Sequence, residues 1–339
     1  MTKPLDALRI GLTLCSALAF TSACSSSDDS SDAGKADTHD AATKPTTDAG
    51  KSNAGSDEVV GTFTISSIAP TDTEPDGHTT VLGKVYDGAT PAQVVWEAGS
   101  KSGACQLSTP RVPFCNTPCG GSAVCVDDDQ CQAYPTAHSV GAVKVSGVKT
   151  SAGASEFTMN PIANTYQPSG DTKLPFPAFS EGDAISVSAA GGDYKAFTIN
   201  AHGVDTLELD KDTYALERGK ELALGWTAGK SASASIHIKL DISHHGGSKG
   251  MIECDTSDSG SLSIGADLIG SLLDLGVAGF PTIVVTRHDD GTASIAPGKV
   301  QLTVVSSVET AVTVPGLSSC SDDSQCPSGK TCQADLTCQ

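Results

Sequence analysis

Two adjacent histidines in a glycine-rich turn, His244 and His245, are the side chains whose chemistry is easiest to name. Imidazole nitrogens are common zinc ligands, and a zinc site needs three or four converging ligands. His202 and Asp255 are the side chains that can complete such a set, whereas His237 lies on the polar face of a predicted strand. A metal site at His244, His245, His202 and Asp255 is therefore the alternative to a simple hairpin turn, in which the glycines permit positive φ.

The sequence Ser-His-His-Gly at residues 243–246 is similar to a loop that lies near the metal centre of metallo-beta-lactamase-like hydrolases. This resemblance implies a metal-dependent hydrolase centred on His244 and His245. The chain departs from that family because it has no His-x-His-x-Asp-His motif upstream of the pair.

Two other catalytic signatures are incomplete in the sequence. The stretch Gly225 to Ser231 is one residue too short for a phosphate-binding loop, and an alternating strand follows it where a helix should begin. A serine with glycine two residues away on each side occurs once, at Ser248 between Gly246 and Gly250, but no helix is predicted directly after it, as a nucleophile elbow requires. We therefore predict a protein that is not an enzyme and that uses no cofactor.

Ten of the twelve cysteines have the number and spacing of a disulfide framework, which forms in oxidising compartments. The last four allow three pairings, of which we favour Cys320 with Cys332 and Cys326 with Cys338. Parity then favours a long-range bridge to Cys254. Its predicted partner is Cys105, which lies outside the tight cluster formed by Cys115, Cys119, Cys125 and Cys131. Such a bridge would join the two domains predicted below.

The two cysteine-rich segments contain too few apolar residues to build a core. The stretch Cys125 to Cys131 resembles Cys320 to Cys326, since each has neighbouring aspartates and a glutamine before its second cysteine, so we expect one kind of hairpin to occur twice. A disulfide that closes a loop of about ten residues contributes on the order of 3 kcal/mol. The aspartates do not follow the EF-hand pattern, which favours a solvated turn over a calcium site.

Residues 1–23 have the features of an export signal: two basic residues, an apolar run, and small residues directly before Cys24. This pattern resembles a bacterial lipoprotein signal, which is cut before a lipid-bearing cysteine. The resemblance implies that Cys24 carries the lipid, although that family prefers Leu where Thr21 stands. The alternative is an ordinary secretory cut after Ala19 or Ala23.

The segment 24–57 between this cysteine and the first predicted strand has no Val, Ile, Leu, Met or aromatic residue. It cannot bury enough apolar surface to offset its ordering entropy, so we predict a tether. Over most of its length the chain resembles uncharacterised Cys-rich envelope lipoproteins of Gram-negative bacteria, which implies attachment to a membrane through the lipid. By analogy with that group, Ser25 directly after Cys24 indicates the outer membrane. A net charge of -19 argues against a nucleic-acid partner.

From Val59 onward, short alternating runs are broken by Gly, Pro, Asn and Asp, which is typical of antiparallel sandwiches. The clearest strand is Ala232 to Ser243, where apolar and polar residues alternate throughout. One helix is predicted at Ala266 to Leu275, ending at Gly276. The other strands are expected at 62–65, 80–86, 93–96, 142–148, 184–188, 194–200, 222–227, 283–286 and 300–305.

We therefore predict an all-β protein with two β-sandwich domains. The first spans 58–203 with a Cys-rich insert at 105–131, the second spans 204–317, and a Cys-rich hairpin at 318–339 ends the chain. The stretch Leu222 to Thr227 looks like the Trp-bearing strand of immunoglobulin-like or fibronectin type III-like modules, which implies that architecture for the second domain and no activity.

The function predicted from these features is that of a membrane-anchored extracytoplasmic binding, structural or cell-contact protein. Its expected partner is an envelope protein or a polysaccharide. Trp96 and Trp226 both lie in predicted strands and are expected in the core. A carbohydrate-binding module is therefore an alternative that would need an exposed strip of aromatic rings.

Overall fold

The computed structural model describes residues 57–71 and 74–339. The predicted signal peptide 1–23, the lipid on Cys24 and all of the linker 24–57 except its last residue lie outside the described residues. The described part is all-β, as predicted, with eighteen strands, one α-helix and one short 3-10 helix. Within it, no helix has the length and apolarity needed to span a bilayer.

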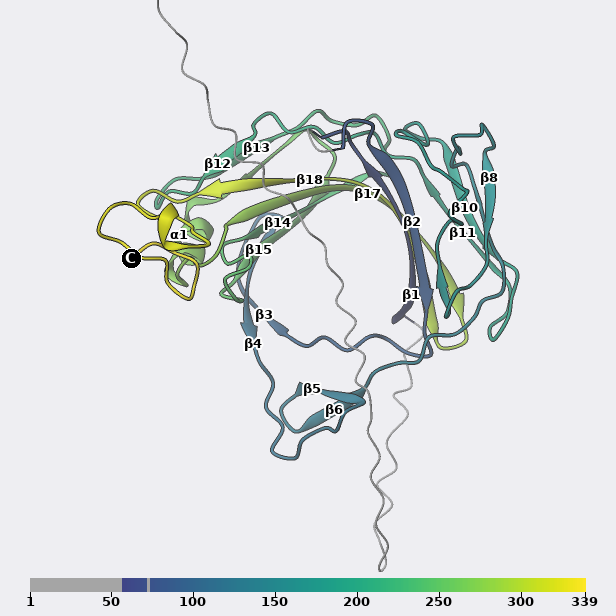
Figure 1. Cartoon of the computed structure of the whole chain (residues 1–339), viewed down its shortest axis with the longest axis horizontal. Coiled ribbons are helices and arrows are strands. Elements are labelled where there is room, and N and C mark those ends of the chain that lie inside the picture. Colours follow the sequence, from purple (N-terminus) through teal and green to yellow (C-terminus); the bar gives the residue numbers. More distant parts are fainter. Residues whose placement is uncertain (1–56, 72–73) are drawn as a thin grey trace, which may run out of the picture. The chain divides into compact units, whose positions relative to one another are not determined.

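One sheet of ten strands organises this part of the chain (Figure 1). Nine strands follow the order β3-β4-β15-β14-β17-β18-β1-β2-β9, and β12 pairs with β18 beside this path. The strands are β1 (Val59–Ile68), β2 (His78–Val85), β3 (Val95–Ser102), β4 (Cys105–Arg111), β9 (Thr165–Tyr166), β12 (Thr213–Ala215), β14 (Ser235–Asp241), β15 (Met251–Ser257), β17 (Thr282–Ile295) and β18 (Gly298–Thr313).

The remaining strands form smaller sheets, and the chain has one α-helix. A four-stranded sheet has the order β11-β10-β7-β8, and two-stranded sheets pair β13 with β16 and β5 with β6. Their bounds are β5 (Ala123–Asp127), β6 (Gln130–Ala133), β7 (Val143–Ser146), β8 (Glu156–Met159), β10 (Ala184–Ala189), β11 (Phe197–His202), β13 (Leu222–Gly225) and β16 (Ser261–Ile264). Helix α1 (Ala266–Asp274) buries four apolar side chains, and the chain leaves it through Gly276 at φ 84.

The register of β14 follows directly from its sequence. Ile236, Ile238 and Leu240 are fully buried, while the alternating residues His237 and Lys239 lie on the polar face. A shift by one residue would bury the polar set, which fixes the pairing of β14 with β15 and β17.

The described residues form two hydrophobic cores that share the large sheet. The long strand β18 contributes Val300, Leu302 and Val304 to the first core and Val312 to the second. The first core lies mainly among residues before 204, and the second lies mainly after it. The large sheet crosses the predicted boundary at 203/204, because β1 pairs in parallel with β18.

Strands β17 and β18 are much longer than the sequence predicted, and buried polar residues explain the difference. Arg287 is 1% exposed and Asp289 is 4% exposed, so polar side chains occupy alternate buried positions along β17. Ser306 does the same in β18. These residues interrupt the apolar alternation by which a strand is recognised.

The two tryptophans have different environments. Trp226, just after β13, is 3% exposed and belongs to the second core, as expected. Trp96 is 37% exposed, so its predicted place in the core is wrong. The reason is its position on β3, which is the edge strand of the large sheet and extends beyond the core.

Candidate functional site

Five disulfides join all ten cysteines of the described residues. Cys105 on β4 is bonded to Cys254, which lies directly opposite on β15, 149 residues away in the sequence. At the C-terminus Cys320 pairs with Cys332 and Cys326 with Cys338. These are the pairings that the sequence favoured. In the insert, the pairs are Cys115 with Cys125 and Cys119 with Cys131.

The two cysteine-rich modules share one connectivity, in which the first cysteine pairs with the third and the second with the fourth. The third and fourth cysteines face each other across a hairpin in both modules, Cys125 opposite Cys131 and Cys332 opposite Cys338. Four residues after the third cysteine, both chains turn through positive φ, at Asp129 (56°) and at Leu336 (60°).

The repeated element is therefore Cys125–Cys131 with Cys332–Cys338, and the predicted match of Cys125–Cys131 with Cys320–Cys326 is wrong. The shared aspartates misled the comparison because Asp accepts backbone N–H groups at many kinds of turn. Asp322, for example, caps the 3-10 helix η1 (Asp323–Gln325) by accepting from the Ser324 N–H.

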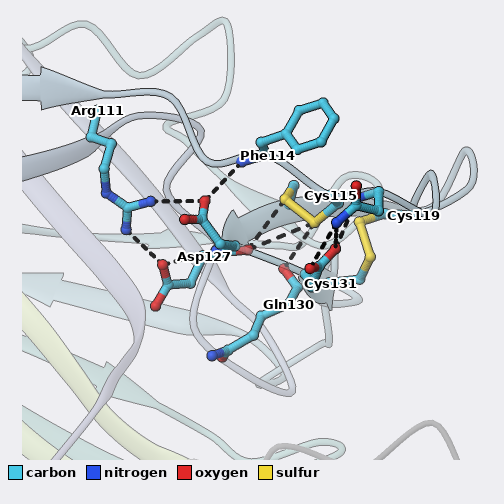
Figure 2. Close-up of a disulfide and its surroundings, with 11 residues drawn as sticks. Arg111, Phe114, Cys115, Cys119, Asp127, Gln130 and Cys131 are labelled. Carbon is cyan, nitrogen blue, oxygen red and sulfur yellow. Dashed lines mark hydrogen bonds and ion pairs between the residues drawn. A yellow bond between two sulfur atoms is a disulfide. The ribbon is translucent and has the colours of Figure 1, made fainter.

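Arg111, the last residue of β4, ties the insert to the large sheet (Figure 2). Its guanidinium lies 2.8 Å from Glu97 Oε1 on β3, 2.6 Å from Asp127 Oδ1 and 3.0 Å from Asp128 Oδ1. The hydrogen bond to Asp127 raises the pKa of Arg111 and lowers the pKa of Asp127. Three carboxylates thus surround one guanidinium.

The aspartates also order the chain that enters the module. Asp128 Oδ1 accepts the backbone N–H of Phe114 at 3.1 Å, and Asp129 accepts both the backbone and the side-chain N–H of Asn116. Their oxygens therefore serve the turn and the start of the insert, which agrees with the solvated turn that the sequence predicted.

Exposed apolar side chains gather on the insert and on its attachment to the sheet. Of the seven large hydrophobic side chains that are exposed in the described residues, four lie between 96 and 134. Val112 is 78% exposed and Phe114 is 68% exposed, and Trp96 and Tyr134 are exposed to a lesser degree. Sequence reasoning missed this cluster, although Val112-Pro113-Phe114 is an apolar run beside a module without a core.

The four predicted metal ligands have separate partners. His244 Nε2 lies 3.8 Å from Glu309, and the His244 ring contacts the His245 ring in a tilted arrangement at a centroid distance of 3.9 Å. His202 Nδ1 lies 3.6 Å from Asp289, and Asp255 Oδ1 lies 2.8 Å from His237 Nδ1.

The predicted ligand set therefore does not converge. Within 57–71 and 74–339, three or more metal-type ligands approach one another only at cysteine sulfurs. Those sulfurs are already bonded in disulfides. The His244–His245 loop is thus a turn in which His245 takes φ 64.

The polar face of the large sheet carries two histidine–carboxylate pairs on neighbouring strands. On β14, His237 contacts Asp255 and lies 3.6 Å from Glu253. On β17, His288 Nδ1 lies 2.8 Å from Asp290 Oδ2. The hydrogen bond to Asp290 raises the pKa of His288 against the opposing effect of burial, and nearby carboxylates act in the same direction.

The raised pKa of His288 predicts a pH-dependent contribution to stability. This contribution is fully present below about pH 6.5, the pKa of an unfolded histidine, and is lost as the pH rises through the folded value. Replacing His288→Gln should therefore cost up to about 1 kcal/mol at pH 5.5 and less at pH 8.5. Urea unfolding at both pH values checks this, and an equal cost at both would contradict it.

Surface depressions in the described part of the chain include two that lie away from the insert. One, of about 460 Å³, lies between β2 and the segment 167–174, and the other, of about 310 Å³, lies beside Arg218 and Leu273. Neither is lined by the histidine loop or by the exposed cluster at 96–134.

Comparison with known proteins places the chain in no family. No family model and no curated protein sequence matches it. A crystal structure of the fibronectin type III domains FN1–FN3 of chicken CNTN1 aligns with 67% of this chain and 77% of its own, at 9% identity and a TM-score of 0.17. That score is too low to relate the two folds.

Proposed function

We propose that this chain is a non-enzymatic binding protein of the bacterial cell envelope and that its Cys-rich insert is the contact surface. The observation that carries the proposal is the gathering of exposed apolar side chains, Val112 and Phe114 foremost, on a module held by disulfides. Exposed apolar clusters on soluble proteins mark interaction sites. Two short-range disulfides allow the insert to present them without a core of its own.

Photo-crosslinking tests the contact surface directly. A photoreactive amino acid at position 114 should give one reproducible adduct in living cells, because Phe114 projects into solvent. The matched control is position 162, where Ile162 is 66% exposed but lies far along the chain from the insert. Adducts at neither position, or the same adducts at both, would contradict a binding role for the insert.

The proposal includes attachment to the outer membrane by a lipid on Cys24. Five disulfides in the described residues support an oxidising compartment. Each buried lipid methylene adds about 0.8 kcal/mol, so an anchor with several chains holds a protein stably.

The substitution Cys24→Ser is expected to abolish fatty-acid labelling and to release the protein from the membrane fraction of a Gram-negative host. Cys15→Ser is the control that should leave both unchanged. Membrane retention of the Cys24→Ser protein at the level of the unaltered chain would refute the anchor.

Carbohydrate binding is a second candidate because the rings of Trp96 and Tyr134 are both exposed. Gln93, three residues before Trp96, donates from Nε2 to Tyr134 Oη at 3.1 Å. Exposed rings can stack on the apolar faces of sugars. Affinity electrophoresis in gels that contain envelope polysaccharide tests it, with Trp96→Ala as the variant. Unretarded migration of the unaltered protein in all such gels would exclude this candidate.

A further inference from the structure

Exposed acidic and apolar residues adjoin one another where the insert leaves β4, and we call this surface the insert face. It comprises Val112 and Phe114 together with the carboxylates of Glu97, Asp127 and Asp128. The backbone N–H of Phe114 donates to Asp128, so the aromatic side chain starts next to a carboxylate. Asp127 and Asp128 remain 52% and 70% exposed although both contact Arg111.

The charge of the insert face is not balanced by neighbouring cations. Residues 112–143 contain no Lys or Arg, and they include Asp127, Asp128 and Asp129. Arg111 supplies one positive charge to three contacting carboxylates. The insert face therefore carries net negative charge around its exposed apolar side chains.

Building on the proposed function, we infer that the partner of the insert face is a polypeptide segment in which apolar side chains are flanked by Lys or Arg. Such a segment matches both properties of the face, since its apolar residues cover Val112 and Phe114 while its cations meet the carboxylates. Anionic lipid and nucleic acid would be repelled, and a neutral glycan would leave the charge of the face unmatched.

The disulfides give this face a further property that favours binding. Cys115 follows Phe114 directly and is bonded to Cys125, two residues before Asp127. The apolar and the acidic parts of the face are thus linked covalently through one short bridge. A face that is already ordered loses less conformational entropy when a partner binds.

Two designed peptides test the inference on the full chain. Both are amphipathic and share the same leucines, but one has lysines and the other has glutamates on its polar side. The unaltered protein should bind the lysine peptide and not the glutamate peptide in fluorescence anisotropy. Raising the salt from 50 to 500 mM should weaken binding, because the charges are exposed and are screened.

The variant V112S/F114S should weaken binding of the lysine peptide by about tenfold or more, as loss of buried anchor residues does at interfaces. The matched control is L82S/I162S, which removes two exposed apolar side chains elsewhere and should leave affinity unchanged. Intact mass under non-reducing conditions, showing all five disulfides, establishes that each variant is folded.

Equal binding of the lysine peptide to V112S/F114S and to L82S/I162S would overturn the inference, because attraction would then come from the net charge of the whole chain. A crosslinked partner at position 114 whose contacting segment lacks Lys and Arg would overturn it while leaving the binding role intact. Absence of any adduct at 114 would remove the proposed function itself.

Discussion

Replacing Arg287→Met is expected to lower the free energy of unfolding by about 3 to 5 kcal/mol, the range for breaking a buried ion pair from one side. The guanidinium is 1% exposed and its Nε lies 2.7 Å from Asp258 Oδ2, which is also buried. Removing the cation would leave a buried carboxylate without its counter-charge. Urea unfolding monitored by tryptophan fluorescence measures the loss.

Asp258 shows how completely this buried pair is satisfied. Its carboxylate also accepts the indole N–H of Trp226 at 2.8 Å and the backbone N–H of Gly229 at 2.9 Å. Burial acts to raise the pKa of Asp258, but these hydrogen bonds and the charge of Arg287 outweigh burial and lower the pKa. The stability that this group contributes is present above about pH 3.9 and is lost as the pH falls through the lower folded value.

The matched control is the exposed pair of Lys144 and Glu156, whose side chains are 50% and 58% exposed at a separation of 2.6 Å. Lys144→Met should cost less than about 1 kcal/mol, because exposed pairs are screened by solvent. A loss of similar size in both variants would show that the network around Arg287 adds nothing beyond a surface contact.

A purely apolar replacement of the buried pair is not expected to restore stability. Arg287 also donates to the backbone carbonyl oxygens of Asp205, Thr206 and Thr227. An Arg287→Met/Asp258→Leu protein would leave those oxygens without their donor, and a buried unsatisfied carbonyl costs about 1 to 3 kcal/mol. The arginine thus fastens the segments around 205 and 227 to the long strand β17.

The same residue explains where sequence reasoning succeeded and where it stopped. Strand β14 was predictable because its apolar and polar residues alternate without exception between Ile236 and Leu240. Strand β17 was predicted at only four residues because Arg287 and Asp289 stand at buried positions. Whether a polar residue is buried depends on partners that are distant in sequence, such as Asp258, and no local pattern reveals them.

The candidate site was predictable in part for a similar reason. The disulfide between Cys105 and Cys254 was predicted by counting cysteines. An even number of cysteines has to pair, and this number is known from the whole sequence without any local pattern. The insert face was missed because Glu97 reaches Asp127 only through Arg111, after β3 and β4 have paired. The metal site at the histidine loop was predicted from residue types alone, but His244, His202 and Asp255 contact Glu309, Asp289 and His237 instead of one another.

The bridge between Cys105 and Cys254 leads to the second large effect. Replacing both with alanine should lower the free energy of unfolding by about 2 to 5 kcal/mol, since the bond closes a loop of 149 residues. Both cysteines are buried in the second core, so each substitution also removes packed volume. Thermal unfolding of the oxidised protein measures the loss.

The matched control is the removal of the disulfide between Cys320 and Cys332. That bond closes a loop with a separation of only 12 residues, in a module outside the large sheet. That variant should loosen its own module and leave the main unfolding transition within about 1 kcal/mol of the unaltered protein. An equal shift in both double variants would show that the C-terminal module is as tightly coupled to the cores as β4 is.

The long-range bridge also bears on the insert. Strand β4 pairs with β15 only over the short register from Cys105 to Ser108, and β3 is held in the sheet through β4. Since β4 ends at Arg111, which carries the insert, hydrogen exchange in β3 and β4 should accelerate when Cys105 and Cys254 are replaced. Unchanged protection there would mean that the backbone pairing alone holds the insert face in place, and that the disulfide acts only on the unfolded chain.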